Sequence, residues 1–186
     1  MNPKKIVITG GPATGKTSVV QRLENAGYKC FREIIRDLTL AAKQTGDLQS
    51  LTINPIASVS DPLEFNRKLL RGRIGQFKLA RNVAEDLVFF DRGIPDILAY
   101  MDYFDQTQGP EFIEAATTYK YDVIFLLPMW EQIFATDEER FESYDEALKI
   151  QTRLRETYSG YGYDLIEVPP DSIENRMEFI LEQANR

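Results

Sequence analysis

Residues 10–17 have the composition of a loop that binds phosphate groups. They read GGPATGKT, a full match to the pattern GxxxxGK(S/T). In such loops the glycines let backbone N–H groups surround the phosphates, Lys16 reaches the β- and γ-phosphates, and the Thr17 hydroxyl can bind Mg²⁺. A glycine-rich turn before an ordinary helix would match by chance in roughly one such chain in a hundred or fewer. The segment therefore predicts that ATP is bound by Gly10, Gly11, Pro12, Ala13, Thr14, Gly15, Lys16, Thr17 and Ser18, with Lys16 also catalytic.

A carboxylate and a cation follow the apolar run at residues 87–90. Asp91 ends this run and Arg92 comes next. If the run is a parallel strand, Asp91 lies at the edge where the phosphate loop opens and can hold a water bound to Mg²⁺. The alternative is that Asp91 only caps a helix starting near Pro95, with Arg92 as a surface cation. Motor ATPases need a second carboxylate at the position of Arg92, whose planar guanidinium is better suited to binding an anionic or hydroxylated acceptor.

Glu33 and Arg36 form a candidate acceptor site. Glu33 comes just after the run 28–32, and Arg36 is one helical turn later on the same face. In the functional interpretation, Glu33 orients or deprotonates an acceptor hydroxyl and Arg36 binds an anionic group of the acceptor. A solvated surface ion pair explains the same spacing equally well.

Residues 136–142 are a candidate for a charged lid. They read TDEERFE, with Arg140 as the one cation among acidic residues. Phosphoryl transfer benefits from a mobile cover that expels water and brings a cation to the transferring group, which would be Arg140 here. The alternative is a solvated helix with an internal Glu–Arg pair.

The elements that must position these residues alternate between strands and helices. Strands are expected at residues 4–9, 28–32, 87–90, 123–127 and 165–168. Helices are expected at residues 18–26, 33–43, 62–84, 94–103, 111–118 and about 147–158, with Asp61 as the cap of the third and a last helix capped by Asp171. Together with the phosphate loop, this order predicts one α/β domain over residues 1–186, with the three-layer P-loop NTPase fold: a parallel sheet of about five strands, covered by helices on both faces.

The composition excludes several other classes of function. One cysteine and no histidine rule out a zinc site of His and Cys ligands, so any metal must be held by oxygen. A net charge of −7 disfavours a nucleic-acid partner. No apolar run approaches the roughly 18 residues of a membrane span, and the start of the chain lacks a secretory signal. We therefore expect a cytoplasmic protein with a small-molecule partner, whose oligomeric state the sequence leaves open.

Several blocks occur in the order of one known family. These blocks are the phosphate loop with the preceding ITGG, FRE at residues 31–33, FFDRG at residues 89–93 followed by Pro95 and Asp96, FLLP at residues 125–128, and Gly162-Tyr163. Over residues 4–181 the chain resembles the AAA-like P-loop domains related to the nicotinamide-riboside kinase half of the bacterial NAD regulator. The resemblance implies a nucleotide-kinase core, use of ATP and Mg²⁺, a lid after the fourth strand that favours Arg140, and an active site lined by Asp91 and Arg92.

Two functional hypotheses follow from these residues. The first is a Mg²⁺-dependent kinase that transfers the γ-phosphoryl group of ATP to a nucleoside-like or other hydroxylated metabolite. The second is an ATP-dependent regulatory switch, an ATPase that controls a protein partner. A GTPase is disfavoured because no Asn-Lys-x-Asp motif is present and no Asp-x-x-Gly motif begins at Asp91.

Overall fold

A five-stranded parallel sheet lies at the centre of the structure. The structure, a computed structural model, describes residues 2–35, 38–39, 59–134 and 142–186. The strands are β1 (Lys4–Thr9), β2 (Lys29–Phe31), β3 (Leu87–Asp91), β4 (Val123–Leu126) and β5 (Leu165–Glu167). Their order in the sheet is β2-β3-β1-β4-β5, with every neighbouring pair parallel. The predicted sheet of about five parallel strands is confirmed.

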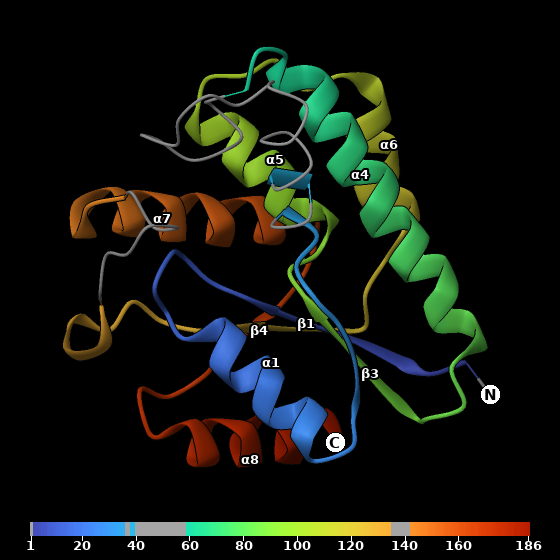
Figure 1. Cartoon of the computed structure of the whole chain (residues 1–186), viewed down its shortest axis with the longest axis vertical. Coiled ribbons are helices and arrows are strands. Elements are labelled where there is room, and N and C mark those ends of the chain that lie inside the picture. Colours follow the sequence, from blue (N-terminus) through green and yellow to red (C-terminus); the bar gives the residue numbers. More distant parts are fainter. Residues whose placement is uncertain (1, 36–37, 40–58, 135–141) are drawn as a thin grey trace.

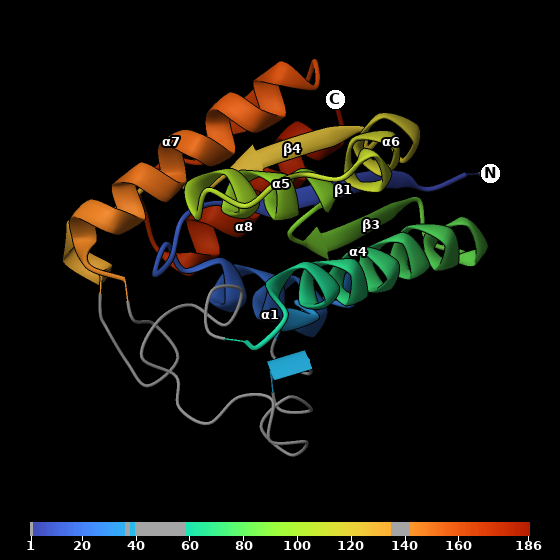
Figure 2. The ribbon, with the colours of Figure 1, turned by 90° about the horizontal axis from the view of Figure 1, so that it is seen from above.

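Helices cover both faces of this sheet. They are α1 (Lys16–Asn25), α4 (Pro62–Leu79), α5 (Ile94–Tyr103), α6 (Pro110–Thr118), α7 (Tyr144–Gly160) and α8 (Ile173–Ala184). Figure 1 shows α1 and α8 on one side of the sheet and α4, α5 and α7 on the other. Seen from above, α5 lies between α4 and α7 (Figure 2). The three-layer architecture is confirmed, and no helix in the described part of the chain is both long and apolar enough to cross a membrane.

Alternating side chains of the central strands fill two separate cores. Ile6 and Ile8 of β1 pack against α1 and α8, whereas Val7 points to the opposite layer. The same period of two divides β3, where Phe89 joins the first core and Phe90 the second. Buried on both faces, these strands are continuous apolar runs, as parallel strands usually are.

Cys30 lies in the core shared with α1 and α8. Its Sγ atom is 3.9 Å from the carbonyl oxygen of Val20, and burial raises the pKa of the thiol to about 12. Cys30 therefore packs as a small apolar side chain.

Two predicted helix boundaries differ in the structure, and a third predicted helix is largely untested. The helix after Asp61 begins as expected, because the Asp61 carboxylate accepts a hydrogen bond from the Glu64 N–H at 2.9 Å, but α4 ends at Leu79 and continues only as a 3-10 turn at Ala80–Asn82. The cap of the last helix was wrongly predicted. Ser172 caps α8 by accepting from the Asn175 N–H, while Asp171 accepts from the backbone N–H of Ser172. The predicted helix at residues 33–43 lies largely outside the described residues.

The aromatic packing around Phe90 yields a prediction about stability. Phe90 stacks on Phe31 with ring centroids 5.1 Å apart and meets Tyr121 edge-on at 5.2 Å. Phe90→Ala should lower the free energy of unfolding by about 3–5 kcal/mol, because it removes this packing and leaves a cavity. Leu79→Ala, at a side chain that is 59% exposed, should change it by less than about 0.5 kcal/mol. Chemical denaturation measures both, and equal small effects would contradict the packing described.

Candidate nucleotide-binding and acceptor site

The sheet topology gathers the predicted site residues at one edge. The parallel register pairs Ile8 with Asp91, so the end of β3 lies beside the start of the phosphate loop. Phe31 pairs with Phe90, which brings Glu33, two residues beyond β2, to the same edge. The carboxyl ends of three adjacent strands therefore meet where ligands bind in parallel α/β sheets.

The phosphate loop has a backbone that requires glycine at two positions. Gly10 has φ +152°, and a Cβ atom there would lie 2.6 Å from the carbonyl oxygen of Leu127. Gly15 has φ +83° and precedes the first residue of α1. The N–H groups of Lys16, Thr17 and Ser18, in the first turn of α1, have no partner within the helix, so they form the positive end at which an anion can bind.

The Lys16 ammonium group folds back onto the loop. Its Nζ donates to the carbonyl oxygen of Gly11 at 2.6 Å and to Oγ1 of Thr14 at 3.2 Å. Burial, followed by the nearby charge of Arg92, lowers the pKa of Lys16 to about 7. The charged form of Lys16 is therefore destabilised in this structure, and a bound phosphate anion would stabilise it.

Asp91 is the last residue of β3 and does not cap a helix. The residue preceding α5 is Gly93, so the capping alternative is wrong. Burial and the neighbouring charge of Glu33 raise the pKa of Asp91 to about 6. Among the described residues, no donor forms a hydrogen bond with the Asp91 carboxylate. Its oxygens therefore suit a water bound to Mg²⁺, and the exposed Thr17 hydroxyl lies on the adjoining first turn of α1.

No protein cluster holds a metal by itself in the described ranges. Groups of three or more Asp, Glu, His or Cys side chains suited to a metal are absent from that part of the chain. Mg²⁺ usually takes only one or two protein oxygens, with the rest from water and substrate phosphates, so the pair formed by Thr17 and Asp91 fits this ion.

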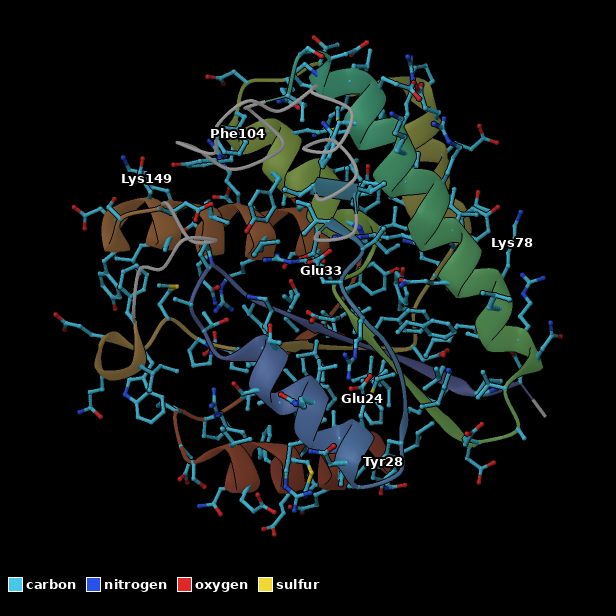
Figure 3. The ribbon with its side chains drawn as sticks, in the orientation of Figure 1. Glu24, Tyr28, Glu33, Lys78, Phe104 and Lys149 are labelled. Carbon is cyan, nitrogen blue, oxygen red and sulfur yellow. The ribbon has the colours of Figure 1, made fainter. Side chains whose placement is uncertain are left out.

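Glu33 is held by two arginines, the buried Arg73 and the partly buried Arg92. Its Oε1 accepts from Nη2 of Arg73 at 3.0 Å, and its Oε2 pairs with Nε of Arg92. The Glu33 side chain is only 12% exposed, so the interpretation as a solvated surface pair is wrong. Figure 3 shows Glu33 near the middle of the molecule, whereas Glu24 lies on α1. Arg36, its predicted neighbour, lies outside the described residues, as does Arg140.

Asp96 joins the site to its surroundings through four donors. Its Oδ1 accepts from the Thr9 hydroxyl at 2.6 Å and from Arg92 at 3.2 Å. Its Oδ2 accepts from the Tyr158 hydroxyl at 2.6 Å and from the Gly93 N–H at 2.8 Å. Burial opposes ionisation, but the charge of Arg92 and these hydrogen bonds lower the pKa of Asp96. One carboxylate thus connects β1, the turn after β3, and α7.

The sequence interpretation missed four polar side chains that contact the site: Arg73, Asp96, Gln151 and Arg176. The sequence alone does not show which polar residue of α4 points inward, and of Arg67, Arg71, Arg73 and Gln76 it is Arg73 that is buried. It lies four residues after Leu69 and four before Phe77, in the apolar stripe of α4. A polar residue that interrupts an apolar stripe is the signal that could have identified it.

Arg176 links the C-terminal helix to the phosphate loop. Its Nη1 donates to the carbonyl oxygen of Thr14 at 3.0 Å, and its guanidinium lies 5.9 Å from the ring centroid of Trp130. A Cβ atom on Gly15 would lie 3.0 Å from this Nη1, so the glycine also makes room for the arginine.

The raised pKa of Asp91 predicts a pH-dependent stability difference. Between its ordinary value of 3.8 and about 6, the folded protein keeps a proton that the unfolded chain releases. Raising the pH through this window therefore destabilises the wild type. Asp91→Asn lacks this proton, so its stability relative to wild type should rise by about 2 kcal/mol between pH 4 and 6. Urea denaturation across this range measures the difference, and a difference independent of pH would contradict it.

The four donors around Asp96 predict a large cost for losing its acceptor oxygens. Asp96→Asn places an NH₂ group against donors and removes the charge beside Arg92, so it should destabilise the fold by about 2–4 kcal/mol. Asp102→Asn is the matched control on the same helix, since Asp102 forms a half-exposed pair with Arg153. It should cost less than about 1 kcal/mol. Thermal and urea unfolding compare the stability of the two variants. Similarly small losses of stability in both would contradict the importance of the four hydrogen bonds to Asp96.

Comparisons with known proteins identify the family and the fold. A family model described as an AAA domain matches residues 5–176. No curated protein sequence matches the chain. The NadR protein in complex with NR has a TM-score of 0.74 at 14% identity, covering 97% of this chain and 50% of that one. Thymidylate kinase from Candida albicans has a TM-score of 0.70 at 15% identity, covering 99% and 92%. Deoxyadenosine kinase from M. mycoides has a TM-score of 0.67 at 16% identity, covering 97% and 98%.

The low identities limit these structural matches to the fold, which is that of the P-loop nucleoside and nucleotide kinases. The family follows from the sequence model, which spans well over half of the chain and confirms the resemblance given by its motifs. The chain belongs to the AAA domain family of P-loop proteins.

Proposed function

We propose that this protein is a Mg²⁺-dependent kinase that transfers the γ-phosphoryl group of ATP to a hydroxyl group of a nucleoside-like metabolite. The observation that carries the proposal is the buried carboxylate of Glu33, held by Arg73 and Arg92 at the same sheet edge as the phosphate loop. A phosphoryl acceptor needs such a group to orient its hydroxyl, whereas bound nucleotide alone does not. Kinase activity in the structurally similar proteins supports the same reaction class.

In this proposal, each residue has a defined task. The N–H groups of the phosphate loop and Lys16 bind the β- and γ-phosphates. Glu33 accepts a hydrogen bond from the acceptor hydroxyl and takes up its proton as the hydroxyl oxygen bonds to the γ-phosphorus. The bond between the γ-phosphorus and the oxygen that bridges to the β-phosphate breaks, and ADP leaves. Mg²⁺, held by Thr17 and through water by Asp91, would neutralise charge on the phosphate oxygens. Arg140 as a lid cation, and Arg36 as an acceptor contact, are proposed from the sequence alone.

The charge balance of the site favours an uncharged acceptor. Lys16, Arg73 and Arg92 face three carboxylates, those of Glu33, Asp91 and Asp96, with which they interact electrostatically. Each arginine is already paired with Glu33 or Asp96. An acceptor that carried its own phosphate would therefore have to displace an existing ion pair, whereas a nucleoside hydroxyl only needs the Glu33 oxygen.

The alternative, an ATP-dependent switch, rests on the same phosphate loop. It requires hydrolysis or binding without an acceptor, and Arg92 stands where a second carboxylate would activate water. Incubating the protein with Mg²⁺, ATP and a panel of nucleosides separates the two: a kinase produces ADP and phosphorylated nucleoside in equal amounts. ADP formed without any phosphorylated product would favour the switch.

Glu33→Gln should suppress phosphoryl transfer while leaving the affinity for ATP nearly unchanged. With the acceptor found by the screen, kcat should fall about a hundredfold or more, because the hydroxyl loses its carboxylate partner, while the dissociation constant of ATP changes by less than about threefold. Glu24→Gln is the matched control, since Glu24 forms a surface pair with Arg32 and is far from the reaction in this scheme (Figure 3). Lys16→Ala is the opposite control and should abolish ATP binding. Equal loss of ATP affinity and turnover in Glu33→Gln would place Glu33 outside the acceptor site.

A further inference from the structure

The amide side chain of Gln151 sits between two strands where their hydrogen bonding stops. In the β1–β4 ladder the Leu127 N–H donates to the carbonyl oxygen of Thr9 at 2.8 Å. The evenly spaced bonds of a parallel pair would next join the Gly11 N–H to the Leu127 carbonyl. Instead, Oε1 of Gln151 accepts from the Gly11 N–H at 2.6 Å, and its Nε2 donates to the Leu127 carbonyl at 3.0 Å. The side-chain amide replaces a missing rung of the ladder.

Because of this replacement, the phosphate loop can leave the sheet without leaving buried polar groups unpaired. At Gly10 the chain turns away from β4. Gly10 lies so close to Leu127 that a Cβ atom there would clash with the Leu127 carbonyl oxygen. Without Gln151, the Gly11 N–H and the Leu127 carbonyl would both be buried and unpaired, which is costly for a folded protein. Gln151 is buried itself, and it arises from the apolar stripe of α7 between Ala147 and Leu154.

The residue whose N–H is held in this way also organises Lys16 through its next peptide group. The Gly11 N–H belongs to the peptide with Gly10, whereas the Gly11 carbonyl belongs to the peptide with Pro12, and it accepts from Nζ of Lys16 at 2.6 Å and from the Thr14 hydroxyl at 3.0 Å. The two peptide groups meet at the Gly11 Cα, where glycine has more rotational freedom than any other residue, so fixing the first peptide group restricts the orientation of the second. The contact chain therefore runs from α7 through Gln151 and Gly11 to the ammonium group of the phosphate loop.

We propose that Gln151 is a positioning residue that fixes the shape of the phosphate loop and so sets the affinity for ATP. It acts through Gly11 and needs no contact with the nucleotide. The inference rests on the phosphate-loop part of the proposed function and is independent of the acceptor. It also makes α7 the element that supports the nucleotide site from the side opposite α1 and α8 (Figure 1).

Two substitutions at this position separate hydrogen bonding from charge. Gln151→Met keeps the length of the side chain but loses both hydrogen bonds, so we expect ATP to bind roughly tenfold more weakly or worse at every pH. Gln151→Glu, when ionised, keeps the acceptor for Gly11 but faces the Leu127 carbonyl with another acceptor. When protonated, it restores both bonds, because its O–H can donate to Leu127. The affinity of Gln151→Glu relative to wild type should therefore recover by at least about threefold between pH 8 and pH 5.5.

The experiment is isothermal titration of Mg²⁺–ATP into wild type, both variants and Thr152→Met, without acceptor. Thr152 is the exposed neighbour on α7, and its substitution should leave ATP affinity within about twofold of wild type. Near-UV circular dichroism and melting temperature show whether each variant is folded; if Gln151→Met does not fold, Gln151→Leu, which also lacks both hydrogen bonds and carries no charge, takes its place.

The outcomes separate this inference from the proposed kinase. Wild-type affinity in folded Gln151→Met would overturn the positioning role while leaving the kinase proposal untouched. A loss of ATP affinity in Gln151→Glu alone would mean that charge repulsion is the cause, and this result would also overturn the positioning role. Failure of wild type to bind ATP would overturn both proposals, whereas normal ATP binding without phosphorylation of any acceptor would overturn only the kinase.

Discussion

The arrangement of the site depends on the four hydrogen bonds that the Asp96 carboxylate accepts. At 1% exposed, Asp96 is the most deeply buried charged residue in the described part of the chain, and it is tolerated because four donors surround it. Through them it fixes the end of β1, the turn after β3, and α7 in one arrangement. It also holds Arg92, whose backbone has φ +75°, an uncommon conformation for a residue with a side chain. In that conformation Arg92 pairs with both Glu33 and Asp96, so the position of the Glu33 carboxylate depends on Asp96 as well.

The two halves of the site differ in how far apart their residues lie in the chain. The phosphate loop is one continuous segment with its own backbone geometry, so residue types alone identify it. The proposed acceptor half combines Glu33 after β2, Arg73 from α4 and Arg92 after β3, and only the fold brings them together. This difference explains why proteins that share the fold at about 15% identity need not share an acceptor.

The sequence predicted the elements better than the contacts between them. The strands were found because runs such as residues 6–8 and 87–90 are apolar on both faces, which only a covered parallel sheet allows. Asp91 and Glu33 were placed at the correct edge by the same argument. Their partners could not be predicted, because a helical face shows which residues point inward but not which residue of another helix they meet. Arg73, Asp96 and Gln151 each interrupt an apolar stripe, so their burial was open to prediction, but their hydrogen bonds needed the fold.

The burial of Cys30 makes the protein well suited to site-specific labelling. It is the chain's one cysteine, and its thiol, packed against Val20 with a pKa of about 12, stays protonated at neutral pH. Maleimide reagents react with the exposed thiolate, so the native chain should stay unmodified. A cysteine introduced at an exposed position, such as Leu148 on α7, would then be the one site that reacts with a spin label or fluorophore. A second introduced cysteine on α4 would allow the distance between the two helices to be followed as nucleotide binds, without first removing any native thiol.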